Sequence, residues 1–418
     1  MATDIRAIAL ENKIVPGPAA GAMPRLDSVD LLRGIIMVVM ALDHIRDFLT
    51  AVPFAPEDIN RTWPALFFTR WVTHFCAPLF FFLAGTGAFL SMRRGRTPQQ
   101  LSRYLWTRGL WLIFLELTVL AFGWTFVPTA QFAIVIWTLG WSMICMAAIV
   151  RLPLRWIAWF GVIMIAAHNL LDGIAPQQLG RFSWLWTFLH VPGLVWIIPN
   201  KLPFFMLYPL IPWVGVMAAG YAFGAVLLKA PLQRRRIMIT TGLAAIVLFI
   251  GLRATNAYGN PHRPVAGAPG DFHVQSTVAM TIVSFLDTTK YPPSLQFLLM
   301  TLGPGLLMLA LFDKYNDRLA RGVAGPIVVF GRVPMFYYVL HIYAYHLAAI
   351  AVAYLWHQPV DWLWRGGFLL NRAPAGYGHS LPLIYAVWAI VTFILYWPCR
   401  WYADLKKRRR DLWYLSYL

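Results

Sequence analysis

A segment near the start of the chain carries ionisable side chains through an otherwise apolar run. Residues 28–50 read SVDLLRGIIMVVMALDHIRDFLT and include Asp30, Arg33, His44 and Asp47. Ionisable groups inside a bilayer are costly unless they face a polar interior, so their default interpretation is functional. These four side chains are therefore the first candidates for chemistry.

Helical geometry places Arg33 and His44 on one face of this segment. The separation of 11 residues corresponds to about 1100°, which is only about 20° beyond three turns, and to about 16 Å of rise. Asp47 lies within about 40° of the same face, and Asp30 within about 60°. The helix thus carries a guanidinium towards one end and an imidazole with a carboxylate towards the other.

Each end of this face suits a different reaction partner. The planar guanidinium of Arg33 matches phosphate oxygens, so Arg33, with Asp30 beside it, is predicted to bind a phosphate-bearing donor. The imidazole of His44 could act as a general base or accept an acyl group, with Asp47 assisting. The alternatives are a helix-end charge paired with Asp30 and a buried, hydrogen-bonded histidine.

A second apolar segment adds another histidine. Arg70 and His74 lie one helical turn apart, and His74 is expected at a depth similar to that of His44. If the two histidines converge, one could act as the base and the other as its electrostatic partner. Arg70 is a candidate for substrate binding.

The segment 324–356 carries a third group of polar side chains. Tyr337 and His341 share one face, and Arg332 follows a predicted helix break at Gly331. Arg332 is a second candidate for donor phosphates, Tyr337 for substrate binding, and His341 for catalysis. A hydrogen bond to tyrosine or backbone is an equally ordinary role for His341.

Two further ionisable residues lie elsewhere in apolar surroundings. Lys290 precedes a predicted helix in TKYPPSL, where it could bind an acidic acceptor or anchor the loop. Glu116 in the third apolar segment, with Arg108 two turns before it, favours an ion pair with a neighbouring helix.

Composition sets the fold class. Hydrophobic residues make up 59% of the 418 residues and charged residues 12%, which is typical of a multi-span membrane protein. Ten apolar segments are long enough to be predicted spans, at about 30–52, 66–92, 104–127, 131–150, 153–171, 202–228, 236–255, 294–312, 324–356 and 380–402. The sequence predicts an all-α, polytopic membrane helix bundle of about ten transmembrane helices.

The basic residues set the predicted orientation. Most of the 35 Lys and Arg residues lie in alternate connections, which the positive-inside rule places in the cytoplasm, with both termini. We expect a cytoplasmic tail at 1–28 rather than a signal peptide, a transmembrane domain at 29–403 and a basic cytoplasmic tail at 404–418. The predicted outer loop 172–201 has an aromatic run that suits an interfacial helix or a re-entrant element.

Several ligand classes have little support. The net charge of +18 follows from topology and contact with anionic lipid, so no nucleic-acid partner is expected. The three cysteines, Cys76, Cys145 and Cys399, lack metal-ligand or disulfide spacing and are interpreted as small core residues. No metal is expected, and the sequence leaves open whether the protein forms a homodimer.

Four motifs together resemble a known family. Arg33 and His44 in RLDSVDLLRGIIMVVMALDH look like the Arg-x10-His signature of the acyltransferase-3 family. Taken with THFCAPLFFFLAGTGAFLSM, TTKYPPSLQFLLMTLGP and GRVPMFYYVLHIYAYH, the chain resembles a bacterial member of the family named for the catalytic domain of heparan-alpha-glucosaminide N-acetyltransferase.

The resemblance implies an acyl-CoA donor, usually acetyl-CoA, reached from the cytoplasm, and a sugar, glycan or lipid-linked sugar acceptor across the membrane. It implies a multi-pass location in the bacterial inner membrane. The catalytic histidine of the lysosomal enzyme lies in the loop after the first helix, where this chain has Trp63 and Pro64. The role must therefore pass to His44 or His74.

The sequence predicts a membrane acyltransferase that moves an acyl group, expected to be acetyl, to an outer acceptor. A proton-coupled transporter and a non-catalytic membrane component of envelope polysaccharide synthesis are the alternatives. The acceptor, N- against O-transfer, acyl length, and direct transfer against an acyl-histidine stay open.

Overall fold

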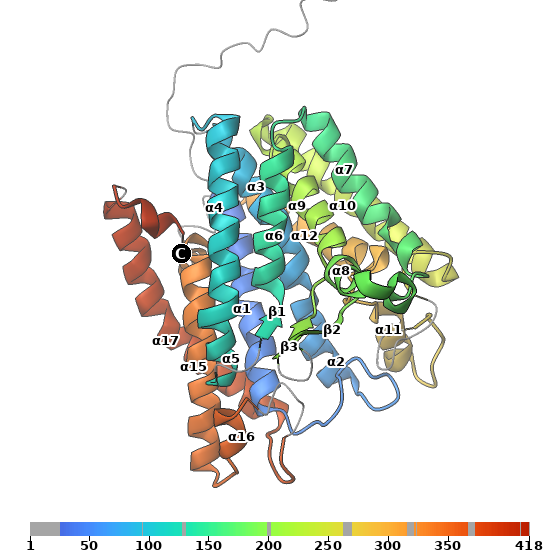
Figure 1. The fold of residues 1–418 in the computed structure, drawn as a ribbon, viewed down its shortest axis with the longest axis vertical. Coiled ribbons are helices and arrows are strands. Elements are labelled where there is room, and N and C mark those ends of the chain that lie inside the picture. Colours follow the sequence, from blue (N-terminus) through green and yellow to red (C-terminus); the bar gives the residue numbers. More distant parts are fainter. Residues whose placement is uncertain are drawn as a thin grey trace, which may run out of the picture.

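The computed structural model describes residues 26–93, 95–127, 131–198, 202–261, 270–315, 322, 324–366, 373–409 and 411–417. Long helices run up and down along one axis (Figure 1). The predicted all-α membrane bundle is confirmed, because eight helices among these residues are long and apolar enough to cross a membrane.

The described residues from Asp27 to Phe223 form nine α-helices, whose bounds are α1 Asp27–Leu49, α2 Pro64–Trp71, α3 Cys76–Arg93, α4 Pro98–Leu115, α5 Ala121–Thr125, α6 Val135–Ile149, α7 Leu154–Ala167, α8 Ser183–Leu189 and α9 Leu210–Phe223. A 3-10 turn at Val72–Phe75 joins α2 to α3, and a π-helical turn at Glu116–Leu120 joins α4 to α5. Further 3-10 turns cover His168–Leu171, Pro176–Phe182 and Val226–Leu228.

The described residues of the second half form the remaining α-helices, namely α10 Pro231–Thr255, α11 Val278–Leu286, α12 Leu295–Lys314, α14 Gly325–Arg332, α15 Pro334–Leu355, α16 Asp361–Trp364 and α17 Leu381–Arg408, followed by a 3-10 turn at Trp413–Ser416. The start of α1 and the end of α17 lie towards the upper side in Figure 1. The cytoplasmic location of that side stays a prediction.

Eight of the ten predicted spans meet the criteria of length and composition, and α1 and α6 do not. The apolar α6 is short, because its predicted segment 131–150 begins with a strand. The 23-residue α1 has acidic residues in its first turn and Arg46 in its last. Since α1 packs against α3, α12, α14, α15 and α17, these charges face protein rather than lipid.

Close backbone contact fixes α1 against α14. A Cβ atom added at Gly34 would collide with the backbone of Ile327, and one at Gly331 would collide with that of Asp30. Only glycine allows this approach. The predicted helix break is confirmed, since α14 ends at Arg332 and α15 starts at Pro334, with Val333 at φ −130° and ψ 50° between them.

A small sheet was not predicted. Strands β1 (Gln131–Ala133), β3 (Leu202–Met206) and β2 (Gly193–Ile198) form one sheet in the order β1-β3-β2, with β1 parallel and β2 antiparallel to β3. The interfacial run at 172–201 therefore contains a short helix, α8, followed by a strand. Short apolar runs fit a buried strand as well as a helix, so periodicity alone could not distinguish them.

Glu116 corrects one expectation. Its Oε2 accepts hydrogen bonds from the backbone N–H groups of Ile136 and Trp137, at 3.0 and 3.2 Å. These groups begin α6, where a helix N-terminus attracts an anion. The expected ion pair of Glu116 with a neighbouring helix is therefore wrong, because the partner is a helix end.

Candidate active site

His44 of α1 and His341 of α15 form the centre of the site. Nδ1 of His44 lies 2.7 Å from Nε2 of His341, and the two rings stack with centroids 4.9 Å apart. Trp124 meets the His44 ring edge-on at 4.7 Å. His341 is fully buried, whereas His44 is half-buried and lines a cavity.

Hydrogen bonds determine which ring nitrogen carries the proton. Nδ1 of His341 lies 3.1 Å from the carbonyl oxygen of Tyr337, and a carbonyl only accepts, so this nitrogen donates. When His341 is neutral, its Nε2 is an acceptor, and Nδ1 of His44 must donate to it. A neutral His44 consequently keeps a lone pair on Nε2. That nitrogen can act as a base or a nucleophile.

The cavity beside His44 has a volume of about 50 Å³. Its α1 wall extends from Ile36 to His44, about 12 Å of helix rise. A water occupies about 30 Å³ of liquid, so the space holds a group of a few heavy atoms. The lining residues are Ile36, Met37, Met40, Asp43, His44, Thr73, Cys76, Ala77, Phe80, Val135, Tyr208, Lys290 and Tyr338.

Lys290 brings a positive charge to this cavity. Its residue is 7% exposed, and its Nζ lies 5.3 Å from the centre of the Tyr291 ring. Lys290 belongs to the loop between α11 and α12. Asn260 holds this loop in place, because its Oδ1 accepts hydrogen bonds from the Thr289 backbone N–H at 2.9 Å and from the Ser294 hydroxyl at 3.3 Å. A firmly held loop therefore positions the ammonium group near His44.

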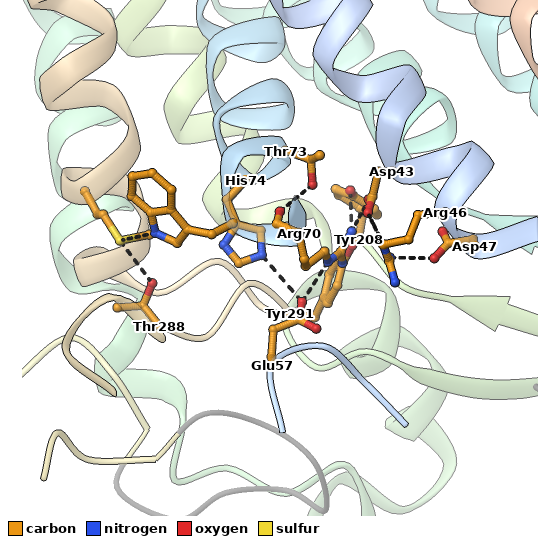
Figure 2. Close-up of polar contacts among 12 residues, drawn as sticks. Asp43, Arg46, Asp47, Glu57, Arg70, Thr73, His74, Tyr208, Thr288 and Tyr291 are labelled. Carbon is orange, nitrogen blue, oxygen red and sulfur yellow. Dashed lines mark hydrogen bonds and ion pairs between the residues drawn. The ribbon is translucent and has the colours of Figure 1, made fainter. Parts of the chain in front are cut away.

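An ion-pair network borders the cavity (Figure 2). Arg46 pairs with Asp43 at 2.8 Å and with Asp47 at 2.6 Å. Arg70 of α2 pairs with Asp43 and, at 2.7 Å, with Glu57 of the loop that follows α1. Asp43 thus joins two guanidiniums, which compensates the burial of its charge.

His74 contacts this network rather than the cavity. Its Nε2 lies 3.5 Å from Oε1 of Glu57, and its ring lies 5.4 Å from that of Phe297. The expected convergence of His44 and His74 is not found, and His341 is the histidine that contacts His44. Within the 3-10 turn at Val72–Phe75, Thr73 lines the cavity, whereas the next residue, His74, points to Glu57.

Electrostatics keep Glu57 ionised. Burial alone would raise the pKa of its carboxyl, but the Arg70 guanidinium and the nearby His74 ring lower that pKa well below its usual value. Glu57 therefore remains a counterion to Arg70 in the acid range as well.

The predicted donor-phosphate residues gather at the other end of α1. Arg33 pairs with Asp30 at 3.3 Å, and its Nη1 donates to the carbonyl oxygen of Gly331 at 3.4 Å. Arg332 pairs with Asp27 at 3.1 Å, with 42% of its side chain exposed. Arg33 and Arg332 thus both lie near the break between α14 and α15, and their binding of donor phosphates stays a prediction.

Of the predicted site residues, only His44 and Lys290 line the cavity, and Tyr337, Arg70 and Asp47 have other roles. Tyr337 is fully buried and stacks on His341 with centroids 5.1 Å apart, so substrate binding by its side chain does not fit. Arg70 is 11% exposed and paired with two carboxylates. Asp47 pairs with Arg46. These residues support the site, and Tyr338 rather than Tyr337 lines the cavity.

Sequence reasoning missed several residues of the site. Asp43, directly before His44, lies about 100° around the helix from it, so the face that carries Arg33 and His44 does not predict Asp43. Glu57 lies in a connecting segment, where periodicity carries no signal, and Tyr208, inside the predicted span 202–228, lies between β3 and α9. Cys76 was interpreted as a core residue but lines the cavity. The adjacency of Asp43 to His44 was the one available clue.

The described residues contain no group of three or more His, Cys, Asp or Glu side chains that could hold a metal ion. The expectation of a metal-free reaction stays a prediction.

Comparison with known families matches residues 25–259, more than half of the chain, to the model described as "Heparan-alpha-glucosaminide N-acetyltransferase, catalytic". A comparison with curated proteins found no match. The matched region contains Arg33, His44 and Arg70. Lys290 and His341 lie beyond it in the chain, and the folded structure places them beside His44. The chain belongs to the family of the catalytic domain of heparan-alpha-glucosaminide N-acetyltransferase, which are membrane acyltransferases.

Proposed function

We propose that this protein transfers an acetyl group from cytoplasmic acetyl-CoA to an amine or hydroxyl of a sugar or glycan at the outer face of a bacterial cytoplasmic membrane. The family supports membrane acetyl transfer in general. The observation that carries the rest is the His44 and His341 pair, which leaves a lone pair on Nε2 of His44, a residue that lines the cavity.

The proposed chemistry is proton transfer coupled to attack on the thioester. Nε2 of His44 takes the proton of the acceptor N–H or O–H as the acceptor atom bonds to the thioester carbonyl carbon. The C–S bond then breaks, and the leaving CoA thiolate takes the proton from His44. His341 acts as a positioning residue, because its neutral Nε2 accepts the Nδ1 proton of His44 throughout.

Lys290 is the proposed substrate-binding group. Among the described residues that line the cavity, Lys290 carries the positive charge, whereas Asp43 is an anion and His44 is the proposed base. An ammonium at this position attracts an electron-rich oxygen of the substrate. Asp43 is held by Arg46 and Arg70, so it contributes a fixed negative charge near the imidazole rather than a proton.

The α1 and α3 interface is the proposed path of the acyl donor. Arg33 and Arg332 would hold donor phosphates at the cytoplasmic end, and the cavity wall begins at Ile36, one turn beyond Arg33. Gly87 of α3 faces this path, since a Cβ there would meet only Nη2 of Arg33, at 3.8 Å. The cavity volume of about 50 Å³ means that the helices must part slightly to admit a pantetheine arm.

Purified protein with labelled acetyl-CoA tests the proposal. We expect thioester hydrolysis or acetylation of an added amino sugar, and a loss of about 10² to 10⁴ in rate in His44→Ala. His273→Ala is the matched control, because this exposed histidine does not line the cavity. Full activity in His44→Ala would contradict the assignment of the base. Absence of CoA binding, with proton-linked uptake of a solute into vesicles, would favour a transporter.

A further inference from the structure

A second hollow lies on the surface of the helix bundle, separate from the cavity at His44. It is an open groove of about 390 Å³ between α4 and α6, and it shares no lining residue with the cavity at His44. The two helices lie side by side in Figure 1. Ser102 ties them together within the groove, because its hydroxyl donates to the carbonyl oxygen of Ala147 at 2.6 Å.

Two arginines from different elements line this groove. Arg103 belongs to α4, and Arg151 follows the end of α6; both are exposed. Within the described part of the chain, neither guanidinium has an ion pair or a hydrogen bond to another side chain. Gln99 adds an amide to the same lining. Two guanidiniums without an internal counterion suit an external phosphate, which each can bind through paired N–H groups.

The rest of the lining is apolar. Trp106 lies about one turn beyond Arg103 on α4 and is 49% exposed. Ile144 and Ala148 continue the apolar surface along α6. On the predicted topology, the arginines lie at the cytoplasmic headgroup level and Trp106 lies at the membrane interface, where tryptophan is favoured. The groove therefore changes from cationic to apolar in the direction of the membrane interior.

We propose that this groove binds an anionic glycerophospholipid, whose phosphodiester contacts Arg103 and Arg151 and whose acyl chains follow Trp106 and Ile144. Charge complementarity selects this ligand, since a basic pocket between helices on the cytoplasmic side attracts anionic headgroups. The apolar part of the groove favours a lipid over a free phosphate, because acyl chains would contact Trp106 and Ile144 and a free phosphate would not.

Native mass spectrometry of the detergent-purified full chain tests the proposal. The protein is titrated with phosphatidylglycerol and, separately, with zwitterionic phosphatidylethanolamine. We expect preferential binding of phosphatidylglycerol and a fall in its affinity of roughly tenfold or more in the Arg103→Gln, Arg151→Gln double variant. Ala148→Phe fills the groove without changing charge, and it should weaken binding as well.

Arg155→Gln is the control, because Arg155 is exposed near the same connection but does not line the groove. Its affinity for phosphatidylglycerol should equal that of the unmodified protein. Equal affinity in the double variant would overturn the proposal. Displacement of bound phosphatidylglycerol by CoA or inorganic phosphate would overturn it too, because the groove would then be a site for soluble phosphates.

Discussion

Nδ1 of His44 lies 2.7 Å from Nε2 of His341, although 297 positions separate the two residues in the chain. The partner of the proposed base comes from α15, beyond the region that matches the family. Because Nδ1 of His341 donates to the Tyr337 carbonyl, the pair has a defined direction. His341 thereby sets the tautomer of His44, a role usually taken by a carboxylate.

Substitution of His341 should lower the turnover rate. We expect His341→Leu to reduce kcat roughly 10²-fold with little change in KM for acetyl-CoA, since a misoriented base loses transition-state stabilisation only. His341→Gln should restore part of the rate, because its side-chain oxygen can accept the Nδ1 proton of His44. Steady-state kinetics of both variants provide the measurement. Equal losses in the two variants would indicate a packing role for His341.

Arg33 should contribute to donor binding. We expect Arg33→Gln to raise KM for acetyl-CoA roughly tenfold with kcat unchanged, the effect of losing a charge-assisted hydrogen bond to phosphate. Arg155→Gln, also on the predicted cytoplasmic side, should leave KM unchanged. An unaltered KM in Arg33→Gln would mean that Arg33 only fixes α1 to α14 through the Gly331 carbonyl, with Asp30 of α1 as its counterion.

Helical periodicity predicted the face that carries Arg33 and His44, because both residues belong to one element. The helix break was predicted from Gly331 and Pro334 rather than from periodicity, and the structure has it at Val333. The contact of His44 with His341 could not be predicted, since it depends on how α1 packs against α15. Arg70 was assigned to substrate because its partner Glu57 lies in a loop without periodic signal. The sequence pattern therefore predicts which residues share one face of a helix. Which helix faces contact each other depends on tertiary packing.

Arg70 should stabilise the fold. Its side chain is 11% exposed and serves two carboxylates, so Arg70→Gln leaves Asp43 and Glu57 with less compensation. We expect a loss of about 3 kcal/mol, the lower range for removing one member of a buried ion pair. Thermal unfolding in detergent measures the effect. Arg61→Gln removes an exposed pair with Asp58, 58% exposed on the arginine, and should change stability by less than about 1 kcal/mol.

The contact between α1 and α14 should tolerate no side chain at Gly34. A Cβ there collides with the backbone of Ile327, so Gly34→Ala should cost about 1–3 kcal/mol by overpacking. Gly251 in α10 is the matched control, since a Cβ there meets open space. Gly251→Ala should be neutral or stabilising by up to about 1 kcal/mol. Equal melting temperatures for the two variants would contradict the close approach.

Glu57 should make stability depend on pH in the acid range. Against the effect of burial, Arg70 and His74 lower the pKa of folded Glu57 well below its usual 4.5. The ionised carboxylate therefore stabilises the protein above pH 4.5, and this contribution is lost as pH falls from 4.5 towards the lowered value. Glu57→Gln should melt at a lower temperature at pH 7 and lose less between about pH 5 and 3. Asp411→Asn, an exposed control, should follow the unmodified protein; identical acid profiles for Glu57→Gln and the unmodified protein would refute the effect.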